Sequence, residues 1–259
     1  MNTVFAIAGV VIKELYRRKD FYVLFVLSAL ITIAAGSVNF FKDLVMVRYV
    51  KDICVLLIWF STLIIAVITA ARQIPAEKEN RTIFPLLAKP VSRGQLIAGK
   101  FLGCWLATGL AVLVFYVFFI LVTATKGGDW QLVTYSKSIG LLWLMLGMVI
   151  AMTLLGSVVL SAVSSNTTIC LVVIIGVLFI GEHLNKIALR QSEPVKSITY
   201  TLYYVIPHFE IFDVRNLVVN NKPMPSLKAC GLATLYAGAY VTAFLYCTWL
   251  IFRRQRLNT

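Results

Sequence analysis

Residues 94–101 are the part of the chain that comes closest to a catalytic motif. Gly94, Gly99 and Lys100 match the phosphate-binding loop GxxxxGK[ST], but Phe101 stands where that motif requires the hydroxyl that holds Mg²⁺. A polar segment precedes the match instead of a buried strand. We therefore expect no nucleotide site here, and Gly99 and Gly103 fit a small-xxx-small helix contact better.

Other constellations able to do chemistry are sparse. The two histidines, His183 and His208, each lie near one acid and are expected to be solvated, so we predict no metal site. No serine in an apolar stretch has a histidine or lysine in the same stretch to activate it. The sequence therefore predicts no catalytic residue, and the chain is not expected to be an enzyme. The five cysteines all lie in apolar stretches without a CxxC pair and are read as small core residues: Cys54, Cys104, Cys170, Cys230 and Cys247.

The composition explains why so few polar residues are available. Hydrophobic residues make up 60% of the 259 positions and charged residues 14%, far from the roughly 45–50% and 25% of soluble domains. The apolar residues gather in charge-free stretches, each long enough to cross about 30 Å of hydrocarbon as a helix. The longest stretch, 138–181, fits two crossings, with residues 164–168 as a polar turn. We predict an all-α polytopic membrane protein with six spans, at about 21–41, 53–71, 97–123, 138–163, 168–187 and 229–252.

The formal net charge of +13 is interpreted as a sign of membrane topology. Basic residues cluster beside the predicted spans, where they orient helices and contact anionic lipid, so no nucleic-acid partner is expected. The clusters at the two ends of the chain place both termini in the cytoplasm. The predicted interface anchors are Arg17, Arg18, Lys19, Arg93, Lys100, Arg253 and Arg254.

The first twenty residues are predicted to form an amphipathic helix on the cytoplasmic interface. Val4, Ile7, Val11 and Leu15 share one face by helical spacing. The first apolar run precedes its basic cluster, the reverse of signal-peptide order, so we expect this terminus to be retained. The domain organisation is then residues 1–20 as the interfacial helix, 21–252 as the transmembrane domain and 253–259 as a basic cytoplasmic tail.

The polar segment 72–96 is the largest predicted cytoplasmic feature. Pro75 suits the first position of a short helix, and Glu77 follows in its first turn, where the helix dipole favours acids. Pro85 should end or kink that helix. Ser92 and Gln95 form a capping-box pattern that starts the third span. Because the charge-free stretches place no acid or base at mid-membrane, energy for transport is expected to come from outside the bilayer, through this loop.

The segment 182–228 is predicted to lie on the outer side. Its uncharged run 197–209 is too short to span the membrane. It suits either an interfacial or re-entrant element, or the edge of a longer loop helix.

The loop also resembles a known family. Residues 74–83 (IPAEKENRTI), 86–93 (LLAKPVSR) and 99–100 (GK) resemble the cytoplasmic loop of type 2 ABC transporter permeases, and 13–19 and 203–210 look like family patterns. Asn80 departs from the usual glycine, and Pro85 interrupts the expected helix. The resemblance implies six helices per subunit and a coupling helix that contacts a separate ABC ATP-binding subunit, which would bind ATP and Mg²⁺. The implied contact residues are Glu77, Glu79, Arg81, Thr82, Leu86 and Leu87.

These observations predict the permease subunit of an ATP-binding-cassette exporter in the bacterial cytoplasmic membrane, with no cofactor of its own. A second copy is expected, and small residues are expected to allow close helix packing at or near the dimer seam: Gly99, Gly103, Ala233 and Ala237. Two alternatives stay open: a gradient-driven carrier, and a membrane scaffold or maturation factor that does not transport. The spans would suit a lipid-like, peptide or drug-like substrate without selecting one.

Overall fold

The computed structural model describes residues 2–17, 19–37, 43–79, 92–125, 131–188, 196–197, 201, 203 and 205–255. Every regular element in these residues is helical, as the predicted all-α class requires. The helices are α1 (Asn2–Arg17), α2 (Lys19–Ser37), α3 (Asp43–Ala71), α4 (Pro75–Glu79), α6 (Arg93–Thr125), α7 (Leu132–Val159), α8 (Val163–Ala188), the 3₁₀ helix η1 (Phe209–Phe212), α10 (Arg215–Val219) and α11 (Leu227–Arg254).

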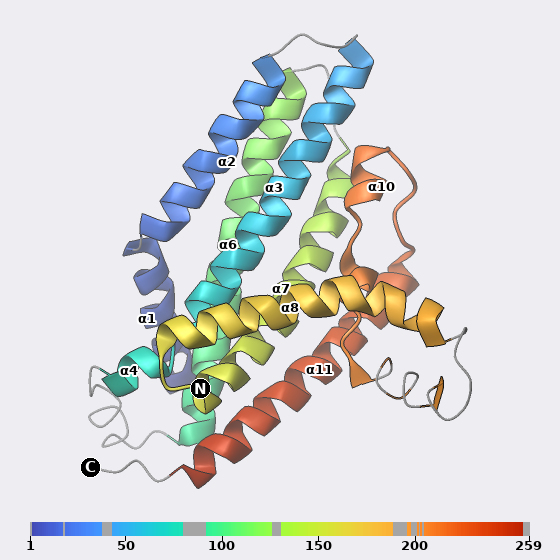
Figure 1. Ribbon diagram of the computed structural model, residues 1–259. Coiled ribbons are helices and arrows are strands. Elements are labelled where there is room, and N and C mark those ends of the chain that lie inside the picture. The colour runs from blue at the N-terminus through green and yellow to red at the C-terminus, as the bar shows by residue number, and fades with distance from the viewer. Residues whose placement is uncertain are drawn as a thin grey trace.

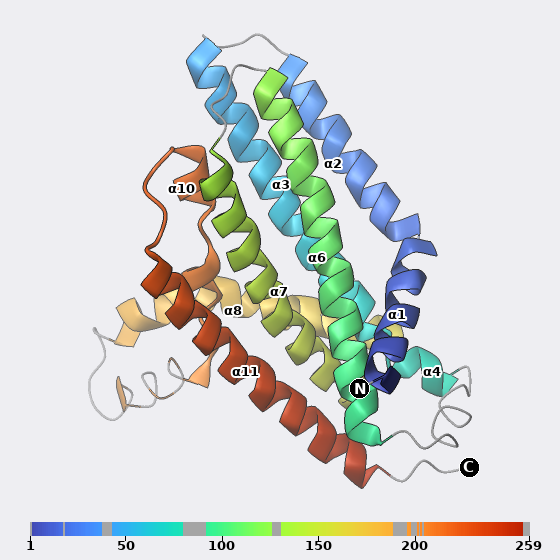
Figure 2. The ribbon, with the colours of Figure 1, turned by 180° about the vertical axis from the view of Figure 1, so that it is seen from behind.

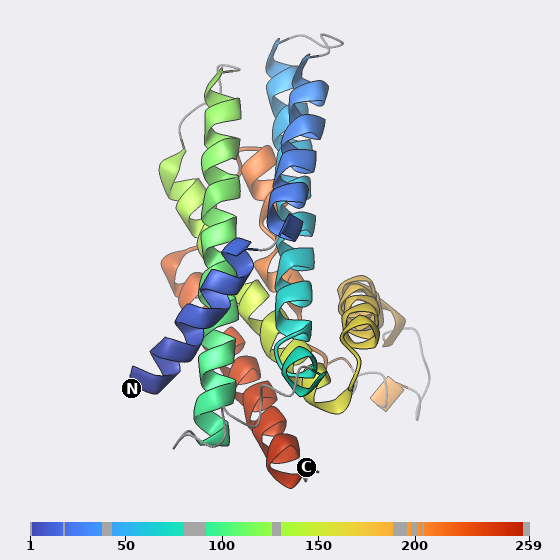
Figure 3. The same cartoon turned by 90° about the vertical axis from the view of Figure 1, so that its left-hand side faces the viewer.

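The long helices form a bundle around α3, α6 and α7 (Figure 1). Helix α2 runs beside α3, and α11 packs obliquely against α7 on the other side (Figure 2). Helix α8 crosses the bundle and is seen nearly end-on in Figure 3. The start of α1, helix α4, the first turn of α6 and the last turn of α11 lie at the same end of the molecule (Figures 1 and 2).

A pair of tryptophans holds α6 against α7. The Trp105 and Trp143 rings stack with centroids 4.4 Å apart. Each indole N–H donates to the backbone oxygen of the other tryptophan, at 3.0 Å and 2.8 Å. Each ring also lies against a glycine on the opposite helix, because a Cβ on Gly109 would come within 2.6 Å of Trp143 and one on Gly147 within 3.0 Å of Trp105. The two helices therefore depend on a specific polar and steric match within an apolar core.

The length of the helices supports part of the predicted topology. Within the ranges described above, four helices are long and apolar enough to cross a membrane: Val47–Glu79, Arg93–Thr125, Leu132–Val159 and Leu227–Arg254. Two shorter apolar helices, Phe21–Ala34 and Val163–Phe179, overlap the first and fifth predicted spans. The chain is thus a multi-pass membrane protein, and the count of six spans stays a prediction.

The predicted turn at residues 164–168 is wrong. The chain turns at 160–162 instead, and α8 already begins at Val163. Asn166 is fully buried, and its Nδ2 donates to the Ala71 oxygen at 2.9 Å, while its Oδ1 accepts from Cys170 Sγ at 3.2 Å. A buried amide that is satisfied by tertiary contacts costs a helix little, so polar composition alone misplaces this turn.

The first helix packs against α6. Of the face predicted from spacing, Val11 is buried and Val4, Ile7 and Leu15 are half-buried. Ala8 and Val11 are buried, whereas Phe5 and Val10 on the other face are exposed. A Cβ on Gly103 would lie 2.7 Å from Val11 Cβ and 3.0 Å from the Ala8 backbone. The absence of a side chain at Gly103 therefore allows the close approach of α1 to α6. The expected position of α1 along the membrane interface stays a prediction.

Candidate functional site

The third long helix starts where its capping box predicts. The backbone N–H of Gln95 donates to Ser92 Oγ at 3.2 Å, and the Ser92 N–H donates to Gln95 Oε1 at 3.0 Å. This reciprocal cap fixes the first turn of α6 and, with it, Arg93. Lys100 follows seven residues later, two turns along the same face of the helix. Residues 94–101 therefore lie within α6 and not in a loop.

Lys100 is the centre of a buried polar cluster. Only 3% of the residue is exposed. Its ammonium donates to the Gln73 backbone oxygen at 2.7 Å, to Gln73 Oε1 at 3.2 Å and to Glu77 Oε1 at 2.7 Å. A lysine buried to this degree needs such partners, because an unpaired charge away from water is very costly. The lysine of the near phosphate-loop match is thus bound to the protein itself.

Gln73 and Glu77 belong to a sharp corner between α3 and α4, which we call the α3–α4 corner (residues 71–79). Gln73 Nε2 donates back to the Thr69 oxygen at 3.1 Å, so its amide oxygen stays turned toward Lys100. Pro75 is the first residue of α4, the position predicted for it, where a missing N–H costs nothing. The corner is therefore fastened to α6 by a charged contact.

The same end of α6 holds the end of α11. Arg93 Nη1 donates to the backbone oxygens of Phe252, Arg253 and Gln255, at 2.6, 3.0 and 3.2 Å. Its guanidinium also lies 5.4 Å from the centre of the Phe252 ring. The last carbonyls of a helix lack partners within it and carry partial negative charge, so a cation placed there stabilises the helix end.

Gln255 connects the corner to a further helix. Its Oε1 accepts from Lys78 Nζ at 2.8 Å, and its Nε2 donates to the Val158 oxygen at 2.7 Å near the end of α7. Asn166 on α8 bonds Ala71, the last residue of α3. Hydrogen bonds therefore link α3, α4, α6, α7, α8 and α11 at one end of the molecule.

The structure brings together some of the predicted coupling and anchor residues. Glu77, Arg93 and Lys100 meet in this network, and Glu79 is exposed at the end of α4. Arg253 and Arg254 are exposed in the last turn of α11. Arg17 and Lys19 are exposed where α1 gives way to α2, away from the network. The remaining predicted residues lie outside the described residues: Arg18, Arg81, Thr82, Leu86 and Leu87.

The four small residues predicted to pack helices do so inside this chain. Gly99 and Gly103 lie against α1, where a Cβ on Gly99 would come within 2.9 Å of Ile7. Ala233 and Ala237 on α11 are 6% and 2% exposed and join the core. Their packing at or near a dimer seam stays a prediction.

Several residues of the network were missed from the sequence. Four residues that form hydrogen bonds of this network were not predicted: Gln73, Lys78, Gln255 and Asn166. Only Asn166 could have been noticed in the sequence, because it is an amide inside a long apolar stretch. Among the residues that the structure describes, no three His, Cys, Asp or Glu side chains gather closely enough to hold a metal ion.

A comparison with protein families decides what kind of molecule this is. The family model described as ABC-2 family transporter protein matches residues 3–257, nearly the whole chain. The chain belongs to the ABC-2 transporter family. This ABC-2 chain is a membrane permease subunit of an ABC transporter, a class in which ATP hydrolysis generally resides on an ATP-binding partner. No curated protein matches the sequence of the ABC-2 chain.

Proposed function

We propose that this ABC-2 chain is the membrane-spanning subunit of an exporter in the bacterial cytoplasmic membrane, with both termini in the cytoplasm. Two copies would form the pathway. A separate subunit would bind ATP and Mg²⁺, and this chain would bind no cofactor. The substrate is not specified by this proposal.

The observation that carries the proposal is the fastening of the α3–α4 corner. Glu79 is exposed there and available to a partner, whereas Glu77, two residues earlier, is held by the buried Lys100. A push on α4 would therefore reach α6 through Lys100 and α11 through the contact of Lys78 with Gln255.

In this mechanism the corner acts as a lever. ATP binding by the partner would draw the corners of two subunits together, and the rigid helices would transmit the movement to the pathway between them. Packed helix interfaces switch between discrete arrangements instead of deforming continuously, which suits this use. The partner would contact Glu79 together with the neighbouring segment that contains Arg81, Thr82, Leu86 and Leu87, and Glu77 would pass the movement to Lys100.

The first experiment asks whether the exposed end of α4 couples the two subunits. The chain is purified in mild detergent, co-purifying ATP-binding subunits are identified, and permease-dependent ATP hydrolysis is measured. Glu79→Lys should reduce this hydrolysis. The matched control is Asp52→Lys, which reverses another exposed acid, on α3, and it should leave hydrolysis unchanged. Equal hydrolysis in both variants would remove Glu79 from the mechanism.

A labelling experiment tests the orientation. In a chain whose exposed Cys247 is replaced by serine, Glu79→Cys should resist a membrane-impermeant thiol reagent added outside cells, whereas Lys222→Cys should react. The reverse pattern would contradict the proposal. Transport without any ATP-binding subunit would instead indicate a gradient-driven carrier, and a bound subunit without substrate flux would indicate a scaffold or maturation factor.

A further inference from the structure

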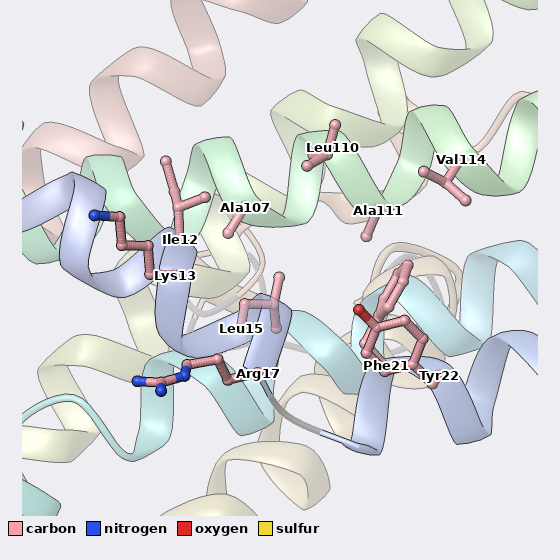
Figure 4. A pocket seen from close by; sticks show the side chains of 10 residues that line it. All are labelled: Ile12, Lys13, Leu15, Arg17, Phe21, Tyr22, Ala107, Leu110, Ala111 and Val114. Atoms are coloured by element: carbon pink, nitrogen blue, oxygen red, sulfur yellow. The ribbon is translucent and has the colours of Figure 1, made fainter.

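A groove between α1, α2 and α6 has no role in the proposed coupling. It encloses about 640 Å³, within the roughly 300–1,000 Å³ of small-molecule sites. Figure 4 shows the side chains around it. The groove is lined by Ile12, Lys13, Leu15, Arg17, Phe21, Tyr22, Ala107, Leu110, Ala111 and Val114.

The shape of the groove follows from the break between the first two helices. Helix α1 ends at Arg17 and α2 begins at Lys19, and the change of direction opens a space beside α6 (Figure 4). Ala107 and Ala111 on α6 are buried and too short to fill it. Leu110 and Val114 beside them are 55% and 37% exposed. The floor is therefore closed and apolar, while one side is open.

The surface around the opening is apolar. On α2, Val23, Val26 and Leu30 are 61%, 53% and 60% exposed, and on α6 Leu121 is 59% exposed. In a multi-pass membrane protein, such large exposed apolar side chains on neighbouring helices are covered by lipid tails. Bilayer lipids therefore have direct access to the groove from this side.

Two basic side chains lie at one end of the groove. Lys13 and Arg17 are four residues apart on α1 and therefore share a face, and both are exposed. In Figure 4 their charged ends lie on the same side, at the end of the groove away from Phe21 and Tyr22. Glu14 is also exposed on α1, but it is turned one position round the helix and does not line the groove. An apolar slot with two adjacent cations matches the two parts of an acidic phospholipid, because arginine and lysine bind phosphate oxygens.

We propose that this groove binds one acidic phospholipid of the bilayer. An acyl chain lies along Leu15, Leu110 and Val114, and the headgroup phosphate accepts hydrogen bonds from Lys13 and Arg17. The lipid thereby bridges α1 and α2 at the break between them.

Lipid binding to the purified chain tests the charged end. The delipidated chain in detergent is titrated with phosphatidylglycerol or phosphatidylcholine, and bound lipid is counted by native mass spectrometry. Phosphatidylglycerol should bind more tightly. The double variant Lys13→Gln with Arg17→Gln should weaken it by about tenfold or more, since each basic residue near a headgroup contributes measurably. Lys13→Arg with Arg17→Lys should restore binding and shows that the fold is intact.

Matched controls separate a site from general attraction. Arg253→Gln with Arg254→Gln removes the same two charges from the exposed end of α11 and should leave affinity unchanged. Leu110→Trp should fill the groove and reduce binding of phosphatidylglycerol, whereas Leu235→Trp, at an exposed position of α11, should not. Equal binding of the two lipids, equal losses in the two charge variants, or full binding by Leu110→Trp would each overturn the proposal.

Discussion

Removal of the Lys100 ammonium should destabilise the fold far more than the loss of an exposed ion pair of the same length. The distances from Lys100 Nζ to Glu77 Oε1 and from Arg215 Nη2 to Asp213 Oδ2 are both 2.7 Å. The side chains of the first pair are 4% and 22% exposed, and those of the second are 28% and 31% exposed. The exposed pair is bidentate, because Arg215 Nε also donates to Asp213 Oδ1 at 2.8 Å. A larger effect at Lys100 would therefore come from its burial and not from a better ion-pair geometry.

The magnitude follows from what each loss leaves behind. Lys100→Met takes the donor away from a largely buried carboxylate and from two oxygens of Gln73. Removing one partner of a buried pair costs about 3–5 kcal/mol, and the partial exposure of Glu77 lowers our expectation to about 2–4 kcal/mol. Glu77→Gln should cost less, because the ammonium keeps both Gln73 acceptors. For Arg215→Met, the loss of the ion pair itself should lower the free energy of unfolding by less than about 1 kcal/mol.

A double-mutant cycle isolates each pair from its other contacts. Lys100→Met with Glu77→Gln should show an interaction energy of about 1–3 kcal/mol. The cycle of Arg215→Met with Asp213→Asn should show less than about 1 kcal/mol and cancels the stacking of Arg215 on Trp59. Free energies of unfolding are measured by denaturant titration in detergent, followed by helical circular dichroism.

The salt dependence of the two interaction energies tests the effect of burial independently. At about 1 M salt, where the Debye length is about 3 Å, the coupling of the exposed pair should vanish while that of the Lys100 pair persists. An interaction energy between Lys100 and Glu77 no larger than that of the exposed pair would refute the reasoning. It would mean that the corner is not held by this contact.

Three further predictions concern the elements around the network. Gly103→Ala should destabilise the protein by about 1–3 kcal/mol, because the new methyl group would collide with Val11. Gly140→Ala, which has open space around it, should stabilise the protein by up to about 1 kcal/mol. If both variants shift the thermal unfolding temperature in the same direction, the close packing of α1 on α6 is contradicted. Ser92→Ala should cost about 1 kcal/mol and speed amide hydrogen exchange in the first turn of α6; unchanged exchange there would argue against the cap. Asn166→Leu should cost about 1–3 kcal/mol by stranding the last carbonyl of α3, and stability equal to the parent chain would show that this bond contributes nothing.

Local patterns in the sequence predicted the features that depend on neighbours along the chain. The capping box of Ser92 with Gln95 and the partly buried face of α1 follow from helical spacing. The place of Pro75 at the start of α4 follows from its missing N–H. The all-helical class follows from long charge-free stretches, because a backbone in hydrocarbon must satisfy its polar groups internally. These requirements act within one helix and can be read without knowing its neighbours.

Contacts between distant segments could not be read in that way. Sequence placed a turn at residues 164–168 because Asn166 and its neighbours are polar, yet the fold buries that amide against Ala71, 95 residues away. Gly99 and Gly103 were recognised as helix-packing residues, but their partner is α1 of the same chain. The partner of a small residue depends on which helix reaches it, and no local pattern carries that information.

The sequence by itself determined that this is a helical membrane protein whose apolar helices are joined by polar, cation-rich segments, because apolar length and charge placement are local properties. Only the tertiary structure decided which polar groups meet. It placed Lys100 between Gln73 and Glu77 and brought Gln255, 177 residues from Lys78, into contact with it. Hydrogen bonds act over about 3 Å whatever the separation along the chain, so their pairing appears only when the helices are packed.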